Sequence, residues 1–351
     1  MKRRAPSPAN DRFTVRMLVE SMLRSVLASV AAFSIFVSSA PALADPPTAP
    51  RKPKQFVLIS FDGAQDLAQW RRSRALAKRA GANFTYFLSC VFLLPPEKRS
   101  DYRPPRMKPG RSNVGFALSK DDVEQRLYQI RLAVKGGNEL ASHGCGHFDG
   151  AKWSETDWAN EFGAFRAILR DAYRLNGLGS EPADWRAIAD QVEGFRAPYL
   201  AANTAIYRAM AREGFAYDAS GVSSAPTTPD LAKPVARFAL PQIAEGPKGR
   251  RVIAMDYNLY VRQSRGKDDP TRWDEFQGRA YDAFKAAFDR QYQGGRVPLQ
   301  LGFHFTLMNG AAYWRALERF AEEACAKPDV ACVTYRGYLA RTGKSLRQIG
   351  G

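Results

Sequence analysis

The chain has 351 residues, enough for one large domain or two small ones, and 45% of them are hydrophobic. This composition excludes a wholly disordered protein. The formal net charge of +17 favours anionic partners such as acidic polysaccharide, cell-wall polymer or membrane headgroups. We do not expect nucleic acid as a partner, because the sequence contains no nucleic-acid recognition motif.

Residues 1–44 have the pattern of an export signal. A segment with six Lys or Arg residues is followed by the apolar stretch 25–39 and by an A-x-A cleavage pattern that ends at Ala44. We therefore predict a periplasmic or secreted protein with a Pro-rich linker at 45–54. The alternative is a retained membrane anchor, which the short, Ser- and Ala-rich stretch disfavours. Cleavage would reduce 52 basic and 35 acidic residues to 46 and 33, a net charge of +13.

Four cysteines occur in the chain, and export to an oxidising compartment favours disulfides. Cys325 and Cys332 flank a Pro-Asp turn, so we predict a local disulfide between them. The pairing of Cys90 and Cys145 stays open. They form a second disulfide or remain inert thiols, while Cys145, which stands between two histidines, has a metal thiolate as its alternative. The oxidising compartment disfavours the thiolate.

Apolar runs and amphipathic stretches alternate along the rest of the chain. Apolar runs predict buried strands at 56–61, 84–88, 139–142, 192–196, 215–218, 252–256, 298–305 and 330–335. Amphipathic spacing predicts helices at 67–80, 120–135, 158–169, 203–213, 273–292 and 311–324. The alternation indicates an α/β domain over 55–340, with parallel strands and outer helices. Seven or eight such strands favour a closed or nearly closed barrel.

Two long segments interrupt this alternation and are predicted to be loops. Residues 95–118 contain five prolines together with Tyr102 and Phe116, and residues 221–250 are rich in Pro, Ser and Gly. Long ordered loops in compact domains are often functional. The first loop is therefore interpreted either as part of a site or as a passive insertion.

The chain contains only three histidines, and all of them follow or end predicted strands. His143 and His147 lie four residues apart after strand 139–142, and His304 lies in strand 298–305. Neutral imidazole is the commonest protein ligand for transition metals and a proton shuttle near neutral pH. In a barrel the carboxyl ends of the strands meet at one mouth. We expect the histidines to converge there with the polar residues Asp62, Arg196 and Asp218.

Four short motifs at these strand ends resemble those of the NodB-type polysaccharide deacetylases, carbohydrate esterase family four, across residues 55–310. The family motif T-F-D-D corresponds to Ser60-Phe61-Asp62-Gly63, and H-[ST]-x-x-H corresponds to His143-Gly144-Cys145-Gly146-His147. The motif R-x-P-Y is present as Arg196-Ala197-Pro198-Tyr199. The last motif, L-x-H, is matched in part by Gly302-Phe303-His304, with Leu301 one position away. The resemblance implies a distorted (β/α)7-type barrel.

The resemblance also implies catalytic and metal-binding roles. His143 and His147 would hold a divalent metal, usually zinc, that polarises the acetamide carbonyl and its bound water. Asp62 would be the general base, and Arg196 would pair with it. His304 would be the general acid that protonates the leaving amine. A metal-activated water, a carboxylate base and an imidazolium acid are what amide hydrolysis requires.

Three further residues receive roles near the substrate. The backbone amide of Tyr199 would help to bind the oxyanion. The family's fourth motif is poorly matched in this chain. Asp218 lies on the expected strand and is assigned to substrate binding, and Asp256 is a second candidate for orienting His304 or Arg196.

The first motif departs from the family at its last position. The second Asp of T-F-D-D normally supplies the third metal ligand, and Gly63 has no side chain to offer. Three interpretations follow: Asp66 reaches back to the metal, Asp62 coordinates it, or the site binds metal weakly or not at all. Two imidazoles and water make a poor zinc site.

The function favoured by these residues is an exported, metal-dependent hydrolase that removes N-acetyl groups from an amino-sugar polysaccharide. One alternative is a catalytically silent glycan-binding barrel that has lost the metal. Another is a metal-independent hydrolase of a non-peptide C–N bond. Gly63 favours these alternatives, whereas a retained base and acid favour the enzyme. The sequence leaves the polysaccharide, the metal and the oligomeric state open.

Overall fold

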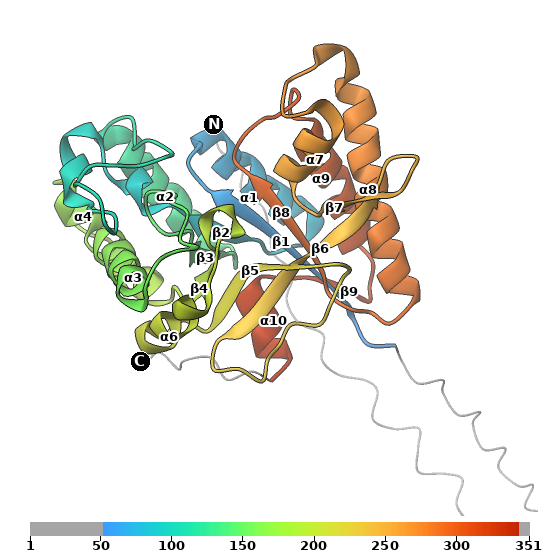
Figure 1. The fold of residues 1–351 in the computed structure, drawn as a ribbon. Coiled ribbons are helices and arrows are strands. Elements are labelled where there is room, and N and C mark those ends of the chain that lie inside the picture. Colours follow the sequence, from blue (N-terminus) through green and yellow to red (C-terminus); the bar gives the residue numbers. More distant parts are fainter. Residues whose placement is uncertain (1–51, 344–351) are drawn as a thin grey trace, which may run out of the picture. The chain divides into compact units, whose positions relative to one another are not determined.

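Strands and helices alternate through residues 52–343, the part of the chain that the computed structural model describes (Figure 1). The predicted export signal lies outside these residues. The strands are β1 (Gln55–Gly63), β2 (Thr85–Leu88), β3 (Glu139–Ser142), β4 (Gly194–Phe195), β5 (Tyr217–Ser223), β6 (Ala236–Glu245), β7 (Arg250–Ile253), β8 (Leu299–His304) and β9 (Val330–Cys332). The α-helices are α1 (Leu67–Ala80), α2 (Lys120–Lys135), α3 (Glu155–Arg170), α4 (Ala172–Leu175), α5 (Trp185–Asp190), α6 (Thr204–Glu213), α7 (Asp256–Ser264), α8 (Trp273–Gln293), α9 (Ala312–Cys325) and α10 (Tyr335–Arg341). Short 3-10 helices are η1 (Cys90–Leu93), η2 (Pro96–Asp101), η3 (Pro198–Leu200) and η4 (Pro270–Arg272).

The predicted helices begin and end where their capping residues place them. Ser119 accepts a hydrogen bond from the Asp122 amide and caps α2, as the sequence indicates. Helix α1 ends at Gly81, which adopts the left-handed conformation that glycine allows without strain. These helices cover the outside of the sheet, and Figure 1 shows α8 and α9 beside β8.

The strands form one sheet in the order β7-β6-β5-β4-β3-β2-β1-β8, and β9 also pairs with β1. All these pairs are parallel except β6 with β7. Met255, just after β7, forms a parallel bridge with Gly302 of β8, which brings the two edges of the sheet together. The sheet is therefore curled into a distorted (β/α) barrel, as the sequence predicts.

The register of the strands sets the height of the residues at the mouth, which we define as the carboxyl ends of β1, β3, β4 and β8. Asp62 of β1 stands opposite His304 of β8. Ser142 of β3 stands opposite Phe195 of β4, so His143 and Arg196 leave the sheet together, one residue later. Pairing of neighbouring strands thus places residues from four distant segments side by side.

Two apolar cores stabilise the domain. The larger lies between the sheet and the outer helices and includes Trp70, Trp158 and Trp314. The smaller lies inside the barrel, where Phe87 and Tyr217 pack against residues of α10. Helix α10 contacts the amino ends of β2 and β3, because the Tyr335 amide donates to Thr85 and the Arg336 amide donates to Glu139. It closes the end of the barrel that lies opposite the mouth.

Several sequence predictions are corrected by the structure. Residues 221–250 are not one loop, because β5 extends to Ser223 and β6 occupies Ala236–Glu245. The buried and half-buried positions of β6 alternate, but Pro241 and its polar neighbours obscure that pattern in the sequence. Predicted strand 252–256 is the short antiparallel β7, and Asp256 begins α7 instead. Predicted strand 330–335 ends at Cys332, after which α10 begins.

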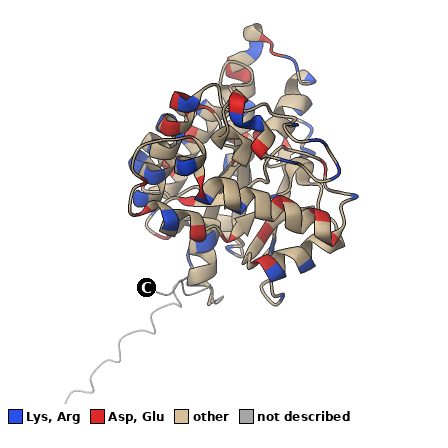
Figure 2. Cartoon of the chain, turned by 90° about the vertical axis from the view of Figure 1, so that its left-hand side faces the viewer, with Lys and Arg blue, Asp and Glu red and all other residues tan. Residues whose placement is uncertain are grey.

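The surface of the described part carries mixed charges. On the face of α2, α3 and α4, Lys and Arg are interspersed with Asp and Glu (Figure 2). Ion pairs such as Arg131–Asp184 and Arg174–Asp171 connect them. None of the helices within residues 52–343 combines the length and the apolar character that crossing a membrane requires.

Candidate active site

The mouth of the barrel brings together most of the residues singled out in the sequence. Asp62 lies near the end of β1, His143 follows β3, Arg196 follows β4 and His304 ends β8. His147 lies on the loop after β3, and its ring centroid is 5.1 Å from that of His143. A carboxylate, a guanidinium and three imidazoles therefore share one small region.

Asp62 and Arg196 form a buried ion pair. Arg196 Nη1 donates to Asp62 Oδ1 over 2.8 Å and to Ser60 Oγ over 2.8 Å. Its Nε donates to the carbonyl of Ala219, and its Nη2 lies 2.8 Å from Tyr335 Oη. Burial alone would raise the pKa of Asp62, but Arg196, followed by His143 and His304, outweighs burial and lowers it. Asp62 is therefore an anion at neutral pH, as a base requires.

His304 is held by a second carboxylate. Its Nδ1 lies 2.6 Å from Asp256 Oδ1, and its backbone amide donates to Asp256 Oδ2 over 2.8 Å. A carboxylate only accepts, so Nδ1 carries the proton and Nε2 is left for chemistry. Burial alone would lower the pKa of His304, but Asp256, followed by Asp62, outweighs burial and raises it. With 28% of its side chain exposed, His304 is an accessible proton donor.

The two imidazoles after β3 have the properties of metal ligands. His143 Nδ1 lies 2.8 Å from the carbonyl of Arg196, so it donates there and leaves Nε2 with a lone pair. Burial lowers the pKa of His143 to about 3, which keeps the ring neutral. Burial also lowers the pKa of His147, whose buried Nδ1 has no hydrogen-bond partner within residues 52–343. Two neutral imidazoles, one with an unpaired nitrogen, fit a divalent ion.

Within residues 52–343 no third ligand is preformed beside these imidazoles. Among the described residues there is no group of three His, Cys, Asp or Glu side chains arranged to hold a metal. The structure does not favour the interpretation in which Asp66 reaches back to the metal. Asp66 Oδ1 instead accepts from the Gln69 amide and caps α1. The residues therefore fit a site held by His143 and His147, with its other positions filled by water, substrate or Asp62.

Two exposed tyrosines flank this group. The ring of Tyr199 lies 4.6 Å from that of His147, and the ring of Tyr257 lies 6.2 Å from that of His304. Their exposed fractions are 62% and 53%, which is unusual for aromatic side chains. Tyr199 and His147 both have φ of 57°, a left-handed conformation that non-glycine residues rarely adopt. Such strain is concentrated at functional sites.

The fold of this chain is similar to that of a solved protein structure. No family model matches the chain, and no curated protein matches it either. Among solved structures, a candidate polysaccharide deacetylase from Mycobacterium smegmatis is 15% identical, covers 88% of this chain and 98% of its own, and has a TM-score of 0.52. The chain has the polysaccharide deacetylase fold. The fold implied by the four motifs is thereby confirmed.

Two other solved structures have lower TM-scores against this chain. A candidate polysaccharide deacetylase from Pseudomonas aeruginosa PAO1 is 16% identical, with coverage of 82% and 90% and a TM-score of 0.48. Puue allantoinase is 18% identical, with coverage of 85% and 95% and a TM-score of 0.48. Both likenesses are weak, with TM-scores below 0.5.

Asp218 differs from the other predicted site residues. It is 1% exposed, and its carboxylate accepts from Ser220 Oγ and, over 3.3 Å, from Tyr207 Oη. Ser220 Oγ in turn accepts from the amide of Ala197, the residue after Arg196. Burial raises the pKa of Asp218 to about 6. Its substrate-binding role stays a prediction, and its contacts favour support of the segment that follows β4.

Three residues that contact the site were missed in the sequence. Tyr335 reaches Arg196 through the barrel, but nothing in its local sequence predicts a helix that plugs a barrel. Glu161 lies on the buried face of α3, and a charged residue within that apolar stripe was an available signal. Tyr102 belongs to loop 95–118, and its Oη donates to Glu161.

All four cysteines form disulfides. The predicted Cys325–Cys332 disulfide is confirmed. Cys90 pairs with Cys145, so Cys145 is not a metal thiolate. The second disulfide connects η1 to the loop that carries the two histidines.

Proposed function

We propose that the protein is an exported hydrolase that removes N-acetyl groups from an amino-sugar polysaccharide. The observation that carries the proposal is the pairing at the mouth of a base and an acid, each with its own partner. Asp62 is paired with Arg196 and His304 with Asp256, and both pairs lie beside two neutral imidazoles. A module that only binds glycan has no need of both pairs.

The chemistry follows from the protonation states. Asp62 is an anion, so it accepts a proton from water as the water oxygen adds to the acetamide carbonyl carbon. His304 in its imidazolium form, which its raised pKa favours, gives the Nε2 proton to the nitrogen as the C–N bond breaks. Acetate and a free amine leave. His143 and His147 would hold a divalent metal, which supplies a Lewis acid and lowers the pKa of water when bound.

The surroundings of the site suit a sugar polymer. Tyr199 and Tyr257 present exposed rings on either side of the imidazoles, and such rings pack against the apolar faces of sugars. The net charge of +13 after signal removal favours attachment to an anionic cell wall or membrane surface. Two disulfides support an oxidising location, either periplasmic or extracellular.

Acetate release from N-acetylated chito-oligosaccharides tests the proposal. The purified protein is assayed after chelation and after addition of zinc, cobalt or nickel, beside the His143→Ala/His147→Ala variant. We expect release that requires both the metal and the imidazoles. Release that persists in the chelated protein and in the variant would identify a metal-independent hydrolase, which Gly63 favours. Binding of the oligosaccharide without acetate release under any condition would indicate a silent glycan-binding barrel.

A further inference from the structure

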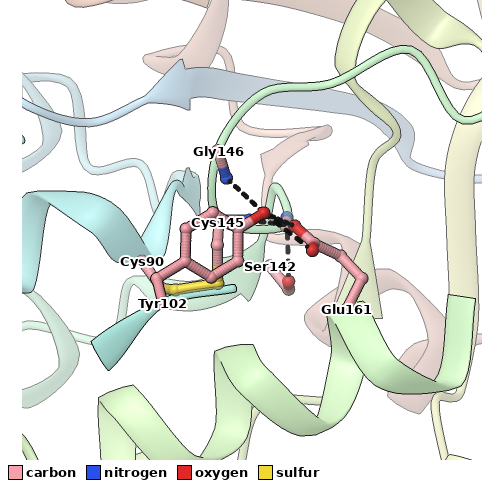
Figure 3. Close-up of a disulfide and its surroundings, with 7 residues drawn as sticks. Cys90, Tyr102, Ser142, Cys145, Gly146 and Glu161 are labelled. Atoms are coloured by element: carbon pink, nitrogen blue, oxygen red, sulfur yellow. Dashed lines mark hydrogen bonds between the residues drawn. A yellow bond between two sulfur atoms is a disulfide. The ribbon is translucent and has the colours of Figure 1, made fainter. Parts of the chain in front are cut away.

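The segment between His143 and His147 is contacted by η1, by loop 95–118 and by helix α3 (Figure 3). Cys145 is joined by its disulfide to Cys90 of η1. The Cys145 amide also donates to Glu161 Oε1 of α3 over 2.6 Å. These contacts are made by Cys145 and not by the imidazoles themselves.

Tyr102 completes the arrangement. Its Oη donates to Glu161 Oε2 over 2.9 Å and accepts from the Gly146 amide over 3.2 Å. The carbonyl of Gly144 accepts from the Cys90 amide over 3.0 Å. Glu161 is 2% exposed and Tyr102 is fully buried, so this network is shielded from water.

The two glycines allow this close packing. Gly144 has φ of 67°, and a Cβ there would lie 2.9 Å from Glu161 Oε1. A Cβ at Gly146 would lie 2.7 Å from the ring of Tyr102. Each residue of the Gly144-Cys145-Gly146 segment therefore serves to hold the loop against Glu161, Tyr102 and Cys90.

We propose that the Cys90–Cys145 disulfide and Glu161 are positioning groups that fix the two imidazoles for metal binding. The inference rests on the proposed metal site. With only two imidazoles dedicated to the metal, the affinity depends strongly on how much freedom these imidazoles lose when metal binds. His147 lies in a left-handed backbone conformation, which persists only where its surroundings enforce it. A preorganised loop thereby offsets the absence of a side chain at Gly63.

The test compares the two disulfides of the same chain. Zinc affinity is measured by competition with a chromophoric chelator, and the cobalt absorption spectrum reports the ligand geometry. We expect Cys90→Ser/Cys145→Ser to weaken zinc binding by about 10- to 100-fold, as loss of groups that orient metal ligands usually does. The matched control is Cys325→Ser/Cys332→Ser, whose disulfide lies beside the first residues of β1. It should leave the zinc affinity and the cobalt spectrum unchanged.

Glu161 variants keep the inference testable if the cysteine variant does not fold. Glu161→Ala should weaken zinc binding by about 10-fold. Glu161→Gln retains an acceptor for the Cys145 amide and should restore most of the affinity. Near-UV circular dichroism on each preparation establishes that the folded protein is measured.

The outcomes separate this inference from the proposed function. Tight zinc binding by wild type with unchanged affinity in the Cys90, Cys145 and Glu161 variants would overturn the inference alone. Equal losses in both disulfide variants would also overturn it, because they would reflect general stability. Absence of zinc, cobalt and nickel binding by wild type would overturn the proposed metal site together with the inference.

Discussion

Two buried carboxylates, one near each end of the barrel, have opposite electrostatic surroundings. Asp62, near the carboxyl end of β1, faces the Arg196 guanidinium, and its pKa is lowered. Glu139, at the amino end of β3, accepts from Thr85 Oγ1, Tyr217 Oη and the Arg336 amide. Burial raises the pKa of Glu139, because these three hydrogen bonds and the weaker attraction of the Arg336 guanidinium compensate only in part. The cation at the mouth preserves an anion that can act as a base.

The two ends of the barrel also differ in the residues that surround these carboxylates. Around Glu139 the helix α10 fills the barrel with aromatic side chains, and both carboxylate oxygens have partners. At the mouth, His147 Nδ1 has no partner among the described residues, and Tyr199 is exposed. One end of the barrel therefore serves stability, while the other leaves polar groups available for a ligand.

The largest expected effect is on catalysis at the mouth. Asp62→Asn and His304→Ala should each reduce acetate release from N-acetylated chito-oligosaccharides by about 10²–10⁴-fold per folded molecule, because each removes a proton-transfer group. Glu139→Gln is the matched control at the other end and should retain activity. Rates are divided by the folded fraction from a thermal melt of the same preparation. Equal losses in all three variants would remove the distinction between the two ends.

The contributions of Asp62 and Glu139 to the free energy of unfolding should change with pH in opposite directions. Asp62→Asn should cost about 3 kcal/mol at pH 7, because it leaves Arg196 buried without its anion. The folded pKa of Asp62 lies below its ordinary value of 3.8, so this contribution is present above pH 3.8 and is lost as pH falls through the folded pKa.

The contribution of Glu139 to the free energy of unfolding has the reverse pH dependence. Its folded pKa lies above 4.5, so the wild type should lose stability relative to Glu139→Gln as pH rises from 4.5 through the folded pKa. Urea unfolding of wild type and both variants across this pH range measures the two trends. Parallel trends for Asp62 and Glu139 would show that Arg196 does not control the difference.

Asp256→Asn should shift the pH profile of the activity. Loss of the Asp256 charge lowers the pKa of His304, and His304 acts as an acid only while protonated. The alkaline limb of kcat/KM should therefore move to lower pH. The Asp218→Asn variant is the comparison, because Asp218 contacts Ser220 and Tyr207 instead of His304. An unchanged alkaline limb in Asp256→Asn would contradict the acid role of His304.

The smallest effect concerns the residue that joins the two ends. Tyr335→Phe removes the hydroxyl that lies 2.8 Å from Arg196 Nη2, while Ser60, Asp62 and Ala219 still bind the guanidinium. We expect a loss of about 1 kcal/mol in the free energy of unfolding, measured in urea. The rate of acetate release should change by less than about 3-fold, since that energy is not specific to the transition state. A loss as large as that of Asp62→Asn would mean that α10 determines the charge at the mouth.

The sequence alone determined the alternation of elements, the mouth residues and the local Cys325–Cys332 disulfide. Each depends on short-range patterns: apolar runs that end in a polar residue, amphipathic spacing, and two cysteines flanking a turn. The tertiary structure decided the partners of those residues. It joined Cys90 to Cys145, selected Asp256 for His304, and placed Glu161 and Tyr335 against the site. These contacts join segments that lie far apart along the chain, with the exception of Glu161 and Cys145, which lie on adjacent elements. Only strand register and helix packing bring such groups within hydrogen-bonding distance, so no local pattern records them.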